Sequence, residues 1–338
     1  MKKRVISAIV FGLIFFPAFI FGGYSQYYNV IGGIYFILFT MFCGYVGTFE
    51  IMNMFYKKSP SLKILRFIVP ALSSLFICSL HFFIATNYHV CIHISPTTPI
   101  KFMCMPTTSS GIIFWNIPWL CANIFYCFIV IIGLLLFSVF KKGASGFDAI
   151  ASIFAFIYGG ILLGLAFSIE YLHINDGRNG WKVFAYVYSI VCFTDIFAYV
   201  IGSKYGKHKL CPTISPNKSV EGAIGGTLIG GFVGTIAAFL IFFASNINNP
   251  NWDCGIGWWI LLIASFFVFS IIVSIVSQIG DLVASKLKRT YEIKDFGNIM
   301  PGHGGVIDRF DSFILAGSFV FIVYAVIDII SYIFRMVW

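Results

Sequence analysis

The sequence predicts an all-α, polytopic integral membrane protein with about nine transmembrane helices. Of its 338 residues, 59% are hydrophobic and only 10% are charged, and the mean hydropathy is +0.93. A soluble domain contains about 25% charged residues, so this chain cannot cover a globular surface with polar groups. The apolar stretches are continuous and about 20 residues long, as helices that cross a bilayer require, whereas barrel strands alternate over about ten residues.

Each expected helix is one of these continuous stretches. They cover residues 5–22, 30–54, 67–86, 112–140, 149–171, 182–201, 222–244, 255–284 and 312–334. The fourth and eighth are long enough to tilt or to extend into water. The first follows a basic MKKR start, which also fits a signal peptide. Because no clear small-x-small cleavage site follows, we expect an uncleaved helix.

Lysine and arginine predict the orientation. With the N-terminus inside, 18 of the 22 basic residues fall in inner segments, which predicts a cytoplasmic N-terminus and an external C-terminus. The outer residues are Lys101, Arg178, Lys182 and Arg335. We therefore expect a multi-pass protein of the cell inner (plasma) membrane. Attraction to anionic lipid accounts for the net charge of +9, so no nucleic-acid partner is expected.

Polar residues divide the chain into two halves. Residues 1–180 supply transmembrane helices, and residues 181–338 form the half expected to be catalytic. The nine cysteines are scattered, and most lie in apolar stretches. Cys91 and Cys104 share an outer loop and are candidates for a disulfide in an oxidising compartment. His89 and His93 lie nearby in sequence, but the spacing matches no common zinc pattern.

Acidic residues are the best functional markers, because a carboxylate in hydrocarbon costs about 2.5–3.5 kcal/mol. We expect Asp148 and Glu170, at helix ends, to be reached by water. Asp195 and Asp281 differ, because each opens onto a run of polar residues and glycines. The chemistry is therefore expected at the inner ends of the later helices.

Of the two polar runs, the one after Asp281, residues 280–312, says more about function. If the helix continues inward, Asp281, Ser285 and Lys288 lie on one face, at i, i+4 and i+7. A following turn contains His303 among glycines, and successive amides there can cradle phosphate oxygens. Two further acids then open the last helix. A carboxylate, a hydroxyl and cations on one face predict a surface for metal and phosphate. The alternative is a charged loop that solvates the membrane surface.

The inner loop 202–222 has a similar character. Asp195, Tyr199 and Gly202 again have helical spacing, and the loop is rich in Lys, Ser and Gly, which suits a polyphosphate. The alternative is a basic loop that binds anionic lipid. In the helix that follows, a glycine recurs every fourth residue from Gly222 to Gly234, which predicts close helix packing.

Residues 285–311, SKLKRTYEIKDFGNIMPGHGGVIDRFD, resemble the signature of the phosphatidate cytidylyltransferases, also called CDP-diacylglycerol synthases. That pattern is Ser, two residues, Lys-Arg, four residues, Lys-Asp, then Pro-x-His-Gly-Gly and Asp-Arg-x-Asp, and every position matches. The segment ISPNKSVEG resembles a second family region, with Asn217 in place of a Lys and Ser219 in place of a Thr. The similarity covers residues 195–312, roughly a third of the chain.

The resemblance implies that CTP and phosphatidic acid give CDP-diacylglycerol and pyrophosphate. It implies Mg²⁺, with K⁺ as an additional candidate, an active site facing the cytoplasm, a membrane-lipid environment and a homodimer. The residues implied in catalysis are Asp281, Asp308, Lys288, Arg289, His303, Arg309 and Asp311, with Asp281 and Asp308 as metal ligands. Those predicted to bind the substrates or their phosphates are Ser285, Lys294, Asp295, Gly304, Gly305, Lys218, Ser215, Asp195 and Tyr199.

Two other classes compete with this interpretation. A transporter would place its acidic residues near the midplane of the bilayer, often at matching positions in two halves of the chain. In this sequence the acidic residues cluster at one membrane face of the C-terminal half. A CTP-dependent polyprenol kinase is the closer rival, because it would transfer the γ-phosphate of the same nucleotide to a hydroxyl.

Overall fold

The computed structural model shows a predominantly helical protein. The described residues are 10, 12–15, 17–19, 30–87, 117–174, 177–178, 180–243, 256–300, 302 and 304–337. They form two compact units, which we call the C-terminal unit (Gly180–Val320) and the N-terminal unit (Ala8–Asn179 with Phe321–Trp338). The expectations for Cys91, Cys104, His89 and His93 concern residues outside those described.

The fold class predicted from the sequence is confirmed. In the described ranges, seven helices are long and apolar enough to cross a membrane, and an eighth apolar helix covers Leu65–His81. These eight match the second to ninth expected spans. Of the first expected span, the described residues 10, 12–15 and 17–19 are helical. The aromatic rings of Phe15 and Phe19 pack on Phe39, at 6.1 and 6.2 Å between ring centroids.

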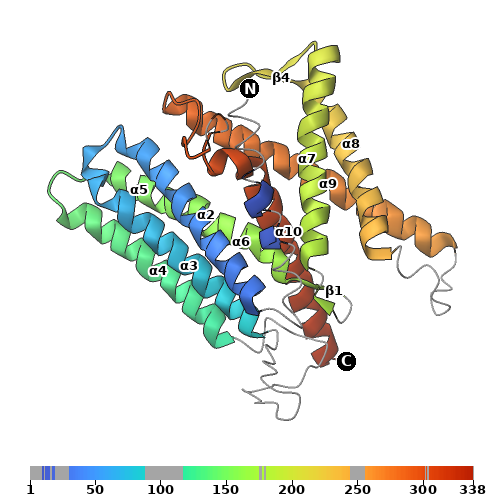
Figure 1. Cartoon of the computed structure of the whole chain (residues 1–338), viewed down its shortest axis with the longest axis horizontal. Coiled ribbons are helices and arrows are strands. Elements are labelled where there is room, and N and C mark those ends of the chain that lie inside the picture. Colours follow the sequence, from blue (N-terminus) through green and yellow to red (C-terminus); the bar gives the residue numbers. More distant parts are fainter. Residues whose placement is uncertain are drawn as a thin grey trace. The chain divides into compact units, whose positions relative to one another are not determined.

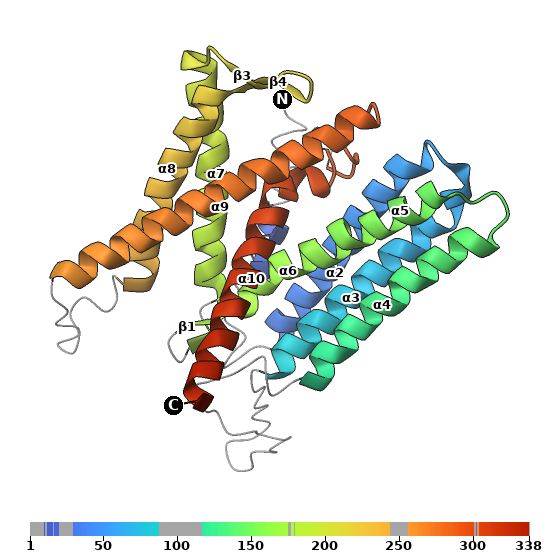
Figure 2. The ribbon, with the colours of Figure 1, turned by 180° about the vertical axis from the view of Figure 1, so that it is seen from behind.

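The N-terminal unit is a bundle whose helices run side by side (Figures 1 and 2). Its larger elements are α2 (Val30–Tyr56), α3 (Leu65–Asn87), α4 (Ile117–Phe140), α5 (Gly146–Ala155) and α6 (Leu163–Ser168). A 3₁₀ turn, η1 (Pro60–Lys63), lies between α2 and α3, and another, η4 (Ile169–Tyr171), follows α6. Two short antiparallel strands come next, β1 (His173–Ile174) and β2 (Gly177–Arg178).

A π-helical stretch, η3 (Phe156–Leu162), joins α5 to α6 and brings this span close to its neighbours. A Cβ on Gly159 would lie 2.5 Å from the Thr48 hydroxyl of α2, and one on Gly160 would lie 2.8 Å from the Ser73 hydroxyl of α3. Glycine is therefore needed at both positions, because a side chain would collide with the adjacent helix.

The C-terminal unit is built from long helices and a small hairpin. Its elements are α7 (Gly180–Tyr205), β3 (Lys209–Cys211), β4 (Ser215–Ser219), α8 (Val220–Ala238), the π-helical η5 (Phe239–Phe243), α9 (Ile256–Thr290) and the first part of α10 (Ile307–Val337). The antiparallel hairpin β3–β4 lies at one end of α7 and α8, and α9 crosses both helices (Figures 1 and 2).

The glycine ridge of α8 packs against α7, as expected from its spacing. Gly222, Gly226, Gly230 and Gly234 are all buried. A Cβ on Gly226 would lie 2.7 Å from the backbone oxygen of Thr194. Polar contacts join α7 to α9 as well, because the Thr194 hydroxyl lies 2.7 Å from that of Ser274. Close packing and hydrogen bonds between spans thus hold the three helices together.

Two expectations about acidic residues are wrong. Asp148 and Glu170 lie near helix ends, but they are only 1% and 2% exposed, so water does not reach them freely. The Asp148 carboxylate accepts hydrogen bonds from the backbone N–H of Ser145 and from the hydroxyl of Ser61, which lies in the turn η1. The contact with Ser61 places η1 against the carboxylate. A helix end is exposed only when no neighbouring turn covers it.

Candidate active site

The first part of the candidate site joins the hairpin to α9. Lys218, on β4, forms an ion pair with Asp281, on α9. The other oxygen of the Asp281 carboxylate accepts a hydrogen bond of 3.2 Å from the hydroxyl of Ser285, one helical turn later. Since α9 continues to Thr290, these residues lie on a helix that extends beyond the expected apolar stretch. Asp281 therefore has a cation and a hydroxyl as neighbours.

The second part joins the end of α9 to the start of α10. The Lys288 ammonium lies 3.0 Å from Oδ1 of Asp308 and 3.8 Å from Oδ2 of Asp311. It also lies 5.4 Å from the ring centroid of Phe296. The Asp308 side chain is only 4% exposed and that of Lys288 is 16% exposed, so this ion pair is shielded from water. In such surroundings, removal of one partner leaves an uncompensated charge.

Asp308 also holds the loop between α9 and α10. Its Oδ2 accepts hydrogen bonds from the backbone N–H groups of Phe296, at 2.8 Å, and Gly305, at 3.0 Å. Within the loop, the N–H of Met300 donates to the carbonyl oxygen of Gly304. One carboxylate thus links the end of α9, through Lys288, to two points of the loop.

Gly304 is required by the local geometry. Its φ is +86°, a value that residues with a side chain rarely adopt, and a Cβ there would lie 2.9 Å from Oδ2 of Asp308. Gly302 also has a positive φ, +81°. Pro301 and His303 lie outside the described residues. The glycine at 304 therefore allows the loop to approach the carboxylate that binds its amides.

Further carboxylates gather around Asp281. Its negative charge interacts with those of Asp195 on α7 and Asp311 on α10. The positive charge of Lys218 interacts with Asp195 as well. Four elements of the C-terminal unit, namely α7, β4, α9 and α10, thus contribute to one group of charged side chains. We call this group the charged cluster: Asp195, Lys218, Asp281, Lys288, Asp308 and Asp311.

The hairpin is anchored at its turn and at its base. Nε of Arg289, on α9, donates to the carbonyl oxygen of Ile214, at 3.2 Å. Arg289 therefore has a structural contact besides the catalytic role expected of it. Glu221, in the first turn of α8, accepts from the backbone N–H of Lys207, at 3.1 Å, and lies 2.6 Å from Nδ1 of His208. These contacts of Glu221 were not predicted, although an acid in the first turn of a helix is a recognisable signal.

Other expected residues lie at the surface. Lys294, Asp295 and Arg309 are exposed, Tyr199 is 76% exposed on α7, and Ser215 is half-buried at the start of β4. In the part of the chain described, none of these side chains hydrogen-bonds to the charged cluster. Conversely, the backbone N–H groups of Phe296 and Ser312 bind its carboxylates and were not expected. Such contacts depend on where the backbone lies more than on residue type.

The charged cluster contains the oxygen ligands that a hard cation prefers. Within the described ranges, no three His, Cys, Asp or Glu side chains converge closely enough to hold a metal ion by themselves. Mg²⁺ is commonly held by one or two carboxylates together with substrate phosphates and water, so this arrangement fits a metal that arrives with a nucleotide. The cluster has four carboxyl groups and two ammonium groups, so it offers more oxygen ligands than fixed cations.

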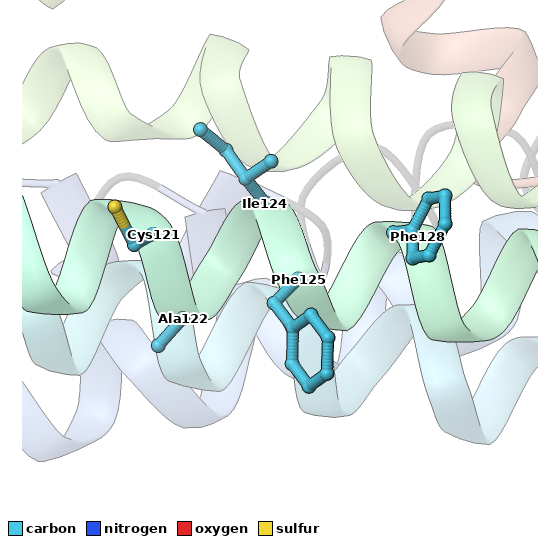
Figure 3. A pocket seen from close by; sticks show the side chains of 5 residues that line it. All are labelled: Cys121, Ala122, Ile124, Phe125 and Phe128. Atoms are coloured by element: carbon cyan, nitrogen blue, oxygen red, sulfur yellow. The ribbon is translucent and has the colours of Figure 1, made fainter.

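A groove on the surface of α4 has a different character (Figure 3). It is lined by Cys121, Ala122, Ile124, Phe125 and Phe128, and no residue of the charged cluster contributes to it. With nearly no polar atom in its lining, it provides no chemistry for binding phosphate. It is the kind of apolar surface that a helix presents to lipid tails.

The fold and the charged cluster define a polytopic, helical membrane protein with a polar site built from four elements of its C-terminal unit. The chain belongs to the cytidylyltransferase family, whose model matches residues 2–327.

Curated relatives agree with this assignment. The chain is 39% identical over 181 residues to a phosphatidate cytidylyltransferase of Staphylococcus haemolyticus, a match that covers 53% of this chain and 61% of that protein. It is 36% identical over 192 residues to a phosphatidate cytidylyltransferase of Bacillus subtilis, covering 57% and 64% of the two chains. The matched part thus spans about three fifths of the length of these relatives.

Proposed function

We propose that this protein is a phosphatidate cytidylyltransferase, which transfers CMP from CTP to phosphatidic acid and gives CDP-diacylglycerol and pyrophosphate. The observation that carries the proposal is the charged cluster, in which two ammonium groups and four carboxylates meet within the stretch 195–312 that resembles the family. The names of the relatives from Staphylococcus haemolyticus and Bacillus subtilis support the same reaction.

The reaction joins two groups that carry the same sign of charge. An oxygen of the phosphatidate phosphate attacks the α-phosphorus of CTP, the bond from that phosphorus to the bridging oxygen of the β-phosphate breaks, and pyrophosphate leaves with the electron pair. Catalysis of such a transfer consists mainly of aligning phosphates and neutralising their charge. The protein therefore needs cations in fixed places more than it needs a nucleophile of its own.

Lys288 and Lys218 are the fixed cations of this proposal. Lys288 is positioned by Asp308 and by the ring of Phe296, so it loses little freedom when a phosphate binds. Lys218 is held on Asp281 at the edge of the hairpin. Further positive charge for the leaving pyrophosphate comes from exposed Arg289, Lys294 and Arg309.

Asp281 and Asp308 would hold the divalent metal that the reaction requires. Asp308 would offer Oδ1, the oxygen that also pairs with Lys288, because its Oδ2 already accepts two backbone N–H groups. When bound, Mg²⁺ withdraws charge from the phosphates that it contacts. Lys218 and Lys288 balance these carboxylates and keep them in place before the nucleotide arrives.

The proposal includes the location and the assembly. The basic residues of the hairpin and of the end of α9 would lie at the cytoplasmic side of the plasma membrane, where CTP is dissolved and where basic loops are retained. A homodimer, implied by the family resemblance, belongs to the same proposal and is checked by the mass of the purified protein in detergent.

The deciding experiment follows the label of CTP. Purified protein is given phosphatidic acid, Mg²⁺ and CTP labelled at either the α- or the γ-phosphate. We expect α-label in the extracted lipid and γ-label in released pyrophosphate. Label from the γ-phosphate in the lipid, with release of CDP, would instead identify a lipid kinase and refute the proposal.

A matched pair of variants links the activity to the charged cluster. We expect Asp281→Asn to lose nearly all activity and to require more Mg²⁺, whereas Glu292→Gln, on an exposed acid just after α9, keeps the parent rate. Chelation of divalent metal should stop the parent enzyme, and added Mg²⁺ should restore it. Full activity of Asp281→Asn at low Mg²⁺ would remove Asp281 from the metal site.

A further inference from the structure

A second group of cations lies at one end of the N-terminal unit. Its members come from the turn after α2, from η1, from the start of α3 and from the turn after α4. They are Lys57, Lys58, Lys63, Arg66, Lys141 and Lys142, and we call them the basic end. Between residues 30 and 174 the acids are Glu50, Asp148 and Glu170, and all three are buried. The exposed charge in the described part of this stretch is therefore positive throughout.

Arg66 is the most unusual member of the basic end. Its guanidinium carbon lies 4.5 Å from the ring centroid of Tyr56 and 4.7 Å from that of Phe67, so the group is held by two aromatic rings. Its Nε is enclosed and has no hydrogen-bond partner. Within the described residues, no carboxylate or carbonyl oxygen pairs with this guanidinium. Stacking fixes the orientation of the planar group and leaves its terminal donors available to a ligand.

A hydrogen bond holds Lys141 at the same end. The Lys141 ammonium donates to the carbonyl oxygen of Ser61, at 2.7 Å, and the hydroxyl of Ser61 donates to Asp148, at 2.6 Å. These bonds fasten η1 to the turn after α4 and to the first turn of α5. Because Lys63 ends η1, it stays beside this junction. Among the described residues, Asp148 forms no ion pair with any of these cations.

Apolar side chains border the basic end. Ile64 is 54% exposed, Phe67 46%, Phe140 78% and Phe147 40%. Exposed aromatic and aliphatic groups beside lysine and arginine are typical of the level where lipid headgroups meet the hydrocarbon. A soluble anion would gain nothing from these neighbours, whereas the acyl chains of a lipid would cover them.

We propose that the basic end binds the phosphate of an anionic phospholipid, with Arg66 as the central contact and Lys57 and Lys63 beside it. A guanidinium presents two parallel N–H donors that match two phosphate oxygens, and the lysines add charge without fixed geometry. All members of the site belong to the N-terminal unit, and none belongs to the charged cluster that we assign to the substrates.

The test measures lipid binding without CTP and without activity. Full-length protein is placed in nanodiscs of phosphatidylcholine with a small fraction of labelled phosphatidylglycerol, an anionic lipid that is not the proposed substrate. We expect the parent to retain phosphatidylglycerol and Arg66→Gln to bind it about tenfold more weakly, a change that corresponds to about 1.4 kcal/mol. Arg66→Lys should fall between them, because an ammonium cannot donate in the same bidentate manner.

Lys204→Gln is the matched control. Lys204 also lies beside an aromatic ring, that of Tyr205 at 5.4 Å, but it belongs to the C-terminal unit, so its loss should leave binding unchanged. Equal weakening by both variants would show attraction by net charge alone and would overturn the proposal. Unchanged binding by Arg66→Gln would do the same. Displacement of the lipid by equal concentrations of inorganic phosphate would identify a site for free anions instead.

Discussion

Lys288, two residues before the end of α9, donates to Asp308, in the first turn of α10, across 3.0 Å and 20 residues of sequence. The same Asp308 carboxylate accepts two backbone N–H groups of the intervening loop. The lysine therefore does two things in our proposal: it presents a cation to phosphate, and it keeps the loop in place through its partner.

We expect Lys288→Met to abolish measurable activity and to destabilise the protein, because removing one partner of a buried ion pair costs about 3–5 kcal/mol. Thermal unfolding in detergent and formation of CDP-diacylglycerol measure the two effects. The double variant Lys288→Met/Asp308→Asn should recover part of the stability and none of the activity. Additive losses of stability would show that the two side chains are not coupled.

We expect Gly304→Ala to reduce activity strongly, because a Cβ would meet Asp308 at 2.9 Å in a backbone conformation that alanine rarely adopts. Gly143 is a fitting control, since its φ is +81° and a Cβ there would meet no atom within 4 Å. Gly143→Ala then carries only the backbone strain, about 1–2 kcal/mol. Similar activity for the two variants would mean that contact with Asp308 is unimportant.

We expect Lys218→Gln to lower activity by at least about tenfold, the effect of losing roughly 1.4 kcal/mol of stabilisation in the transition state. Asn217→Lys, which restores the residue common in the family, should change the rate little. Neighbouring residues of a strand point to opposite faces, and Asn217 is exposed while Lys218 pairs with Asp281. The rates of the two variants at saturating CTP test the prediction. A large gain in rate from Asn217→Lys would contradict the expectation that residue 217 points away from the site.

We expect Gly226→Val to lower the melting temperature, because a side chain there would strike the backbone of Thr194 on α7. On α4, a Cβ at Gly133 would meet no atom within 4 Å, so Gly133→Val isolates the effect of valine within a helix. Thermal unfolding of both variants checks the prediction. Equal melting temperatures would show that α7 and α8 tolerate a wider separation.

Several features of the site could be predicted from the sequence because they depend on local spacing. Asp281 and Ser285 are four residues apart, so a continued helix places them one turn apart, and the structure shows their hydrogen bond. The glycine at every fourth position of α8 similarly predicted a packing ridge. The resemblance of residues 285–311 added the family, which the match over residues 2–327 confirms.

Other contacts could not be predicted, because they join residues that are distant in the chain. Nothing near Arg289 in sequence indicates that it donates to Ile214, 75 residues earlier, or that Asp308 accepts the N–H of Phe296. The burial of Asp148 escaped prediction for the same reason, since Ser61 reaches it across 87 residues.

By itself, the sequence determined that this chain is a helical membrane protein, where most of its spans lie, and which residues carry charge at their ends. Those properties follow from the length of apolar runs and from helical periodicity, which act over a few residues. Only the tertiary structure decided which cation pairs with which carboxylate, and that Arg66 lies between two rings without an acidic partner among the described residues. Such pairings depend on how helices cross and how loops fold back, and these are settled by packing over the whole unit.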